Sequence, residues 1–195
     1  MNRLIALAVT VTLSGAAAAA PETYIIEGSH TLPRFEYNHL GYSNQASRFD
    51  KTTGTIVIDR VAKTGSVNVS IDTTSVNTGS AKFDEHIQGE DFFDTAKYPT
   101  ITYTSDTLRF KGDTLVGVDG NLTIKGITKP VALKVESILC KPHPIMKKAA
   151  CGANAVAKIQ RSDFNLGKYA PAVSDEVTLI IPVEAFKEEE AVIKP

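Results

Sequence analysis

Hydrophobic and polar side chains alternate in several separate stretches of this chain. Residues 67–71 (VNVSI) show the pattern, and residues 101–105, 131–135 and 177–183 repeat it. Because side chains two positions apart lie on the same face of a strand, each stretch predicts a strand with one buried and one solvated face. The enrichment in Val, Ile and Thr favours strands as well.

Turn-forming pairs separate these stretches at short intervals, at Thr53-Gly54, Thr64-Gly65, residues 111–113 and Lys125-Gly126. Many short antiparallel strands in one domain predict an all-β fold, either a sandwich or a closed barrel. The pattern alone does not separate the two. Closure removes exposed edges, and about eight strands leave an interior that is filled by side chains or holds one small ligand.

The segment 75–105 combines aromatic rings with acidic side chains between two strand-like runs. Its main members are Phe83, Phe92, Phe93, Tyr98, Tyr103, Asp84, His86, Asp91 and Asp94. Short helices are expected only between Lys82 and Thr95, one capped by Ser80 and another starting at Asp91. We expect these pieces to lie across one end of the barrel, where the rings cover an apolar interior.

The first twenty residues differ in composition from the rest. Arg3 gives a positive start, residues 4–13 are mostly apolar, and residues 16–20 are alanines suited to signal peptidase. The apolar run is shorter than the roughly 20 residues that a membrane span needs. We expect a signal peptide over 1–20, a single barrel domain over 21–187 and a flexible C-terminal tail over 188–195.

The two cysteines, Cys140 and Cys151, bracket a short turn-like segment. In an exported chain this spacing predicts a disulfide that pins the end of a hairpin, worth up to about 3 kcal/mol. Two free thiols on unrelated faces are the alternative. Between the cysteines, Lys141, Lys147 and Lys148 could meet anionic lipid headgroups, although a solvated hairpin tip is the simpler interpretation.

The charge balance is nearly neutral, with 21 Lys and Arg against 22 Asp and Glu and a formal net charge of −1. Such a balance gives no long-range attraction for nucleic acid. We therefore expect no nucleic-acid partner.

The histidines do not form a recognisable metal site. They are His30, His39, His86 and His143, and none pairs with another at metal-ligand spacing. The set Asp84, His86, Asp91 and Asp94 could offer ligands, but such scatters are common by chance, and we expect no metal. His86 could instead bond backbone beside the helical turns, or face the polar end of a ligand together with His39.

Catalytic signatures are missing from the sequence. There is no G-x-S-x-G elbow and no Gly-rich phosphate loop. The carboxylates of Asp91 and Asp94 could act as an acid and a base, but a solvated or capping role is their default. We expect no enzyme activity, no catalytic residues and no cofactor.

Three further rings, Phe35, Phe49 and Phe164, fall in or beside strand-like runs. Ordinary core packing is the simpler interpretation for each one alone. Together they suggest a barrel that is too wide for its inner side chains to fill, and that therefore holds an apolar cavity. Each lipid methylene buried there contributes roughly 0.8 kcal/mol.

Several motifs resemble those of the YceI-like family of bacterial polyisoprenoid-binding proteins. They are EGSHT (27–31), SVNTG (75–79), DEHI (84–87), DFFD (91–94), YPTITYTS (98–105), GNLTIKGITKPV (120–131) and RSDFN (161–165). The resemblance spans almost the whole chain after residue 20. Two departures are mild, Tyr103 in place of Phe and Asn165 in place of Gly, and Asn tolerates the left-handed backbone that a Gly adopts.

The resemblance implies a lipocalin-like antiparallel barrel of about eight strands that binds a long-chain lipid in the periplasm. It implies carriage or storage of a polyisoprenoid, a quinone precursor or a fatty-acid derivative, with transient membrane contact and a homodimer left open. Our candidate ligand-binding residues are Phe35, Phe49, Phe92, Tyr103 and Phe164 along the tail channel, and His39, His86 and Arg161 near the polar end. Arg161 could equally point outward from a strand. An enzyme acting on such a lipid, and a structural partner of an envelope protein, are the alternative functions.

Overall fold

The computed structural model describes residues 20–189. Residues 1–19 of the predicted signal peptide (1–20) and residues 190–195 of the predicted tail (188–195) lie outside the described residues. Within them the chain forms eleven strands, one α-helix and two short 3₁₀ helices. No helix in this part of the chain has the length and apolar character that a membrane crossing needs.

The elements follow one another in a nearly all-strand order. The strands are β1 (Glu22–Ile26), β2 (Arg34–His39), β3 (Ser43–Phe49), β4 (Thr52–Asp59), β5 (Thr64–Asp72), β6 (Val76–Asn77), β7 (Thr100–Lys111), β8 (Thr114–Ile124), β9 (Ile127–Pro142), β10 (Ala149–Gln160) and β11 (Glu176–Lys187). The helices are η1 (Thr73–Ser75), α1 (Ala81–Gln88) and η2 (Arg161–Phe164).

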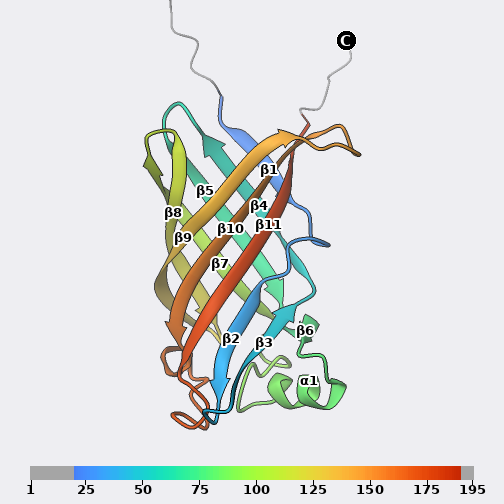
Figure 1. Ribbon diagram of the computed structural model, residues 1–195, viewed down its shortest axis with the longest axis vertical. Coiled ribbons are helices and arrows are strands. Elements are labelled where there is room, and N and C mark those ends of the chain that lie inside the picture. The colour runs from blue at the N-terminus through green and yellow to red at the C-terminus, as the bar shows by residue number, and fades with distance from the viewer. Residues whose placement is uncertain (1–19, 190–195) are drawn as a thin grey trace, which may run out of the picture.

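Eight strands close into one antiparallel barrel, in the order β1, β4, β5, β7, β8, β9, β10 and β11 (Figure 1). Closure comes from β1, which pairs with β4 on one side and with β11 on the other. Tyr24 lies opposite Lys187, and Ile26 lies opposite Ala185. The all-β barrel expected from the sequence and its family resemblance is therefore confirmed.

The last strand, β11, has two partners along its length. Its C-terminal residues pair with β1, whereas Thr178 and Ile180 lie opposite Glu36 and Arg34 of β2. The sheet then continues from β2 through β3 to the two-residue β6. Both β1 and β2 therefore pair with β11. After β1 the chain leaves the sheet, and it returns as β2 beside an earlier part of β11.

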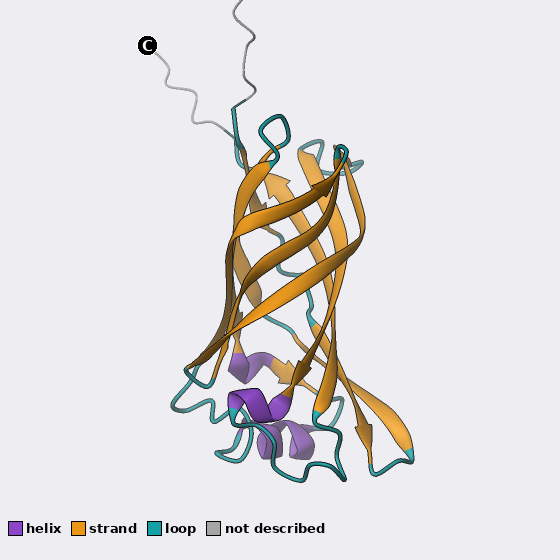
Figure 2. Cartoon of the chain, turned by 90° about the vertical axis from the view of Figure 1, so that its left-hand side faces the viewer, coloured by secondary structure: helices purple, strands orange, loops and turns teal. Residues whose placement is uncertain are grey.

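The two ends of the barrel are different (Figures 1 and 2). The three helices and the β2–β3 turn lie at one end, hereafter the helix end. The β9–β10 turn and both ends of the described chain lie at the opposite end, hereafter the disulfide end. This arrangement confirms short helices across one end of the barrel.

The helical details differ from the sequence expectation. Ser80 occupies the N-cap position of α1, but its side chain makes no capping hydrogen bond. The second helix expected near Asp91 is a series of turns, because Asp94 has a left-handed backbone (φ 47°), which a helix cannot continue through. Helices η1 and η2 lie outside residues 82–95. The prediction that helices occur only between Lys82 and Thr95 was therefore wrong.

Tyr103 illustrates how the barrel wall accommodates its larger rings. Its hydroxyl donates to the carbonyl oxygens of Val118 (3.1 Å) and Val131 (2.9 Å), and burial raises its pKa. A Cβ atom on Gly120 would lie 2.6 Å from the ring of Tyr103. Glycine is therefore required there by close approach, since real Cβ atoms do not come so near.

Candidate functional site

The barrel encloses a cavity of about 540 Å³. Its wall is almost entirely apolar and takes side chains from every barrel strand; on β5 these are Val67, Val69 and Ile71. The alternation seen in the sequence explains this, because Asn68 between two of them is exposed on the outer face. A volume of this size falls within the range of ligand-binding pockets, about 300–1,000 Å³.

Buried side chains form the floor of the cavity at the disulfide end. Tyr24, Ile58, Leu115 and Ala185 line it, and each is at most 9% exposed. The lining at this end is therefore shielded from solvent.

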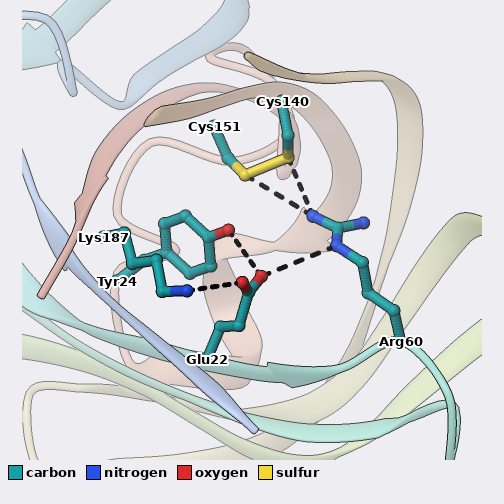
Figure 3. The surroundings of a disulfide bond; sticks show 6 residues. All are labelled: Glu22, Tyr24, Arg60, Cys140, Cys151 and Lys187. Atoms are coloured by element: carbon teal, nitrogen blue, oxygen red, sulfur yellow. Dashed lines mark hydrogen bonds and ion pairs between the residues drawn. A yellow bond between two sulfur atoms is a disulfide. The ribbon is translucent and has the colours of Figure 1, made fainter. Parts of the chain in front are cut away.

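A polar network lies outside this floor (Figure 3). The Tyr24 hydroxyl donates to Glu22 (2.8 Å), which also accepts from Lys187 (2.7 Å). The bond from Lys187 holds the pKa of Glu22 below its ordinary value, while burial raises that of Tyr24. The network joins β1 and β11, which are the first and last strands of the barrel.

The predicted disulfide is present beside this network. Cys140 and Cys151 are bonded and lie directly opposite each other on β9 and β10. The Arg60 guanidinium donates to the sulfur of Cys140 at 2.9 Å, and Arg60 also lies 4.0 Å from Glu22 (Figure 3). The β4–β5 turn is thereby held against the base of the β9–β10 hairpin.

The cavity opens at the helix end. Six of its lining residues there are exposed: His39, Leu40, Phe83, His86, Tyr169 and Ala172. They come from the end of β2 and the turn after it, from α1, and from the loop of residues 165–175, hereafter the mouth loop. Three segments that are distant in sequence thus surround one opening.

Aromatic rings form one side of this mouth. The ring of Phe83 lies 6.0 Å from that of His86, which lies 5.1 Å from Phe92, which in turn lies 6.1 Å from Tyr169. These are ordinary separations for aromatic pairs. The row connects α1 with the mouth loop.

A second aromatic group lies deeper in the cavity. Phe35, Phe49 and Phe93 are in mutual contact, with ring centroids 5.4–5.9 Å apart. Tyr37 stacks on Phe35 at 6.3 Å. Phe93 and Tyr37 were not among the predicted site residues, although each has a sequence signal. Phe93 follows Phe92 directly, and Tyr37 is two positions from Phe35 on the same strand face.

Arg161 lines the cavity from behind the mouth and is buried. Its guanidinium donates to the carbonyl oxygens of Leu166 (2.6 Å), Lys168 (3.2 Å), Val173 (2.8 Å) and Ser174 (2.8 Å). Burial lowers its pKa. The outward orientation considered for this residue is therefore wrong, and the side chain holds the mouth loop in place.

The mouth loop is also tied to β2 and the turn that follows it. The Leu40 amide donates to the Ala172 carbonyl (2.9 Å), and the Ser174 amide donates to the Asn38 carbonyl (3.0 Å). Asn165, where the loop begins, has a left-handed backbone (φ 56°) as its place in the motif suggested. The loop is thus fixed from both sides.

Seven of the eight predicted ligand-binding residues line this single cavity. They are Phe35, His39, Phe49, His86, Phe92, Tyr103 and Arg161. Phe164 does not line it: its side chain is 1% exposed and lies within the packed core. Its predicted place on the channel wall is therefore corrected, because η2 begins at Arg161 and ends the strand alternation.

The residues considered for a metal do not converge. Among residues 20–189, three or more potential ligand side chains come together only at Glu27, His30 and Glu184. Asp84 accepts from Thr78 instead, with 2.7 Å bonds from both its amide and its hydroxyl.

Glu27 organises the turn after β1. It accepts from the Ser29 hydroxyl (2.6 Å) and from His30, and these bonds lower its pKa to about 2. The same contact raises the pKa of His30.

Known proteins resemble this chain both in sequence and in structure. The YceI-like domain family matches residues 24–185. Protein YceI of Escherichia coli O17:K52:H18 (strain UMN026 / ExPEC) is 40% identical over 176 residues, which are 90% of this chain and 91% of the relative. A solved Campylobacter jejuni YceI protein is 30% identical, with a TM-score of 0.66 over 78% of this chain and 90% of that chain.

A third comparison shows the fold alone. A solved structure described as a polyisoprenoid binding domain from Saccharophagus degradans is 18% identical. It aligns with a TM-score of 0.64 over 85% of this chain and 98% of that chain.

Proposed function

Because this chain belongs to the YceI-like family, we propose that it binds a long-chain amphiphilic lipid in its barrel cavity and transports or stores it in the periplasm. The ligand is a polyisoprenoid, a quinone precursor or a fatty-acid derivative. The observation that carries this proposal is an apolar cavity of about 540 Å³ whose lining is buried at the disulfide end and exposed at the helix end. The polyisoprenoid-binding domain of similar fold supports a lipid, and supports binding over catalysis.

The tail of the ligand occupies the cavity. A buried methylene contributes roughly 0.8 kcal/mol, whereas association costs about 4–15 kcal/mol. A tail therefore needs roughly 5–19 buried methylenes before binding becomes favourable. Long isoprenoid and acyl chains meet this requirement, and short amphiphiles do not.

The polar end of the ligand lies at the mouth. His39 and His86 are exposed there and offer ring nitrogens to a headgroup. Arg161 places a buried cation just behind them, although its bonds to four carbonyls leave it few free donors. Tyr37 lines the same cavity, and within residues 20–189 its hydroxyl has no hydrogen-bond partner.

The proposed location rests on the disulfide and on the relatives. Disulfides persist in oxidising compartments such as the bacterial periplasm, and the Cys140–Cys151 bond lies at the exposed base of a hairpin. The composition of residues 1–20 supports export by a signal peptide.

Lipid binding is tested by native mass spectrometry of the protein before and after organic extraction. We expect the purified protein to carry a lipid, and the extracted protein to take up a long-chain polyprenol or fatty acid. An extracted protein that takes up neither would contradict the proposal.

A matched pair of variants places the lipid inside the barrel. Val69→Phe adds a ring to the cavity wall, and Asn68→Phe adds the same ring to the exposed face of the same strand. If the ring displaces about two methylenes, Val69→Phe weakens uptake roughly tenfold. Asn68→Phe leaves uptake unchanged. Equal uptake by both variants would show that the lipid binds elsewhere.

A further inference from the structure

The tip of the β9–β10 hairpin displays apolar side chains far from the cavity mouth. Ile145 is 81% exposed and Met146 is 55% exposed. The hairpin projects from the disulfide end of the barrel, opposite the helix end (Figure 1). These side chains therefore play no part in lining the mouth, and their exposure needs a different explanation.

The tip is built rigidly. The Nδ1 atom of His143 accepts from the amides of Ile145 (3.3 Å) and Met146 (3.1 Å), and the His143 amide donates to the Lys148 carbonyl (2.7 Å). The His143 ring contacts Phe186 of β11 at 5.4 Å. A side chain thus orders the turn so that two apolar residues point into solvent.

The base of the hairpin is fixed as well. The Cys140–Cys151 bond joins its two strands, and Arg60 holds the β4–β5 turn against the Cys140 sulfur. That turn adds Val61, which is 66% exposed, while Leu139 on β9 is 60% exposed. Four exposed apolar side chains therefore gather at this end.

The hairpin segment itself is positively charged. Residues 141–148 contain three lysines and no acidic residue. Lys148 pairs with Glu189 at 3.1 Å, but Lys141 and Lys147 have no carboxylate partner within residues 20–189. The tip therefore combines apolar side chains with uncompensated cations.

We propose that Ile145 and Met146, flanked by Lys141 and Lys147, form a docking tip for the surface of an anionic lipid bilayer. The two apolar side chains enter the boundary between headgroups and acyl chains, and the lysines remain at the level of the phosphates. A convex tip without a groove suits a fluid surface, which needs no preformed pocket. In this orientation the cavity mouth faces away from the bilayer.

Tryptophan reporters test the orientation directly, since the chain has no tryptophan of its own. Met146→Trp marks the tip, and Tyr42→Trp marks a residue that is 89% exposed at the opposite end. With vesicles of phosphatidylglycerol and phosphatidylcholine, we expect a blue shift and quenching by brominated lipid for Met146→Trp only. A blue shift of Tyr42→Trp instead would overturn the proposal.

Charge variants test the contribution of the lysines. Each lysine near an anionic surface strengthens binding about fivefold, so Lys141→Gln with Lys147→Gln weakens vesicle binding about 25-fold. Lys82→Gln with Lys129→Gln, two exposed lysines away from the tip, serves as the control and leaves binding unchanged. Raising the salt to about 1 M shortens the screening length to about 3 Å and releases the protein.

Two results would refute the docking tip. One is the absence of binding to phosphatidylglycerol vesicles, and the other is equal, salt-insensitive binding to pure phosphatidylcholine. Extracted, lipid-free protein is used throughout. The outcome is thus independent of whether the cavity binds a lipid.

Discussion

The buried guanidinium of Arg161 offers the sharpest test of how the mouth is held together. We predict that Arg161→Met lowers the free energy of unfolding by about 2.5–7.5 kcal/mol. The bond to the Leu166 carbonyl is fully buried, and leaving that carbonyl unpaired costs about 1–3 kcal/mol. The other three bonds are partly buried, so water replaces them in part, and each contributes about 0.5–1.5 kcal/mol.

The assay combines urea unfolding with amide hydrogen exchange of the mouth loop. Methionine keeps the apolar stem of the side chain, so the measured loss reports the missing bonds. Arg161→Lys keeps the charge, but a single ammonium cannot reach four separate carbonyls, and we expect an intermediate loss. Lys158→Met is the matched control: it breaks an exposed ion pair with Glu176 and costs under about 1 kcal/mol.

Amide hydrogen exchange shows whether Arg161→Met destabilises only the mouth loop or the whole barrel. If Arg161 fixes the mouth loop, the amides of residues 166–174 lose protection in Arg161→Met more than those of the barrel strands. An unchanged urea midpoint together with unchanged protection of these amides would refute the reasoning. It would mean that the bonds to β2 hold the loop without the guanidinium.

Two further predictions concern the disulfide and the turn after β1. Cys140→Ser with Cys151→Ser lowers the free energy of unfolding by about 3 kcal/mol, as expected for opening a loop of this length; an unchanged urea midpoint would contradict this. The pKa of Glu27 falls from its ordinary 4.5 to about 2 on folding, so its stabilisation is complete above pH 4.5 and disappears as the pH falls toward 2. Thermal unfolding of the wild type and Glu27→Gln should therefore differ at pH 7 and converge near pH 2. A difference that stays constant with pH would show that the carboxylate charge is not responsible.

The sequence predicted the strands and the disulfide but not, by itself, the barrel. Alternation at residues 67–71 or 177–183 identifies a face that avoids water, yet it does not say whether a second sheet or an empty lumen lies opposite. The family resemblance settled that choice. The disulfide was predictable because the spacing of the cysteines and the composition of residues 1–20, which predicts export, point the same way.

The lining of the cavity was predictable only in part. Rings such as Phe35 and Phe92 are conspicuous in the sequence, whereas Val67 and Val69 read as ordinary core residues although they face the lumen. Phe164 was misplaced because nothing in RSDFN shows that a 3₁₀ helix interrupts the alternation there. The missing helix near Asp91 has a similar cause, since Asp tolerates the left-handed backbone found at Asp94 but does not require it.

Pairing between β1 and β11 places the earliest and the latest described strands of the chain side by side. An amino-terminal fragment that lacks β11 therefore cannot close the barrel. The lumen forms only when residues 185–187 pair with residues 24–26. Contacts of such long sequence separation make folding slow. The proposed lipid would have two routes inside: enclosure while the wall is closing, or entry afterwards past the rings at the mouth.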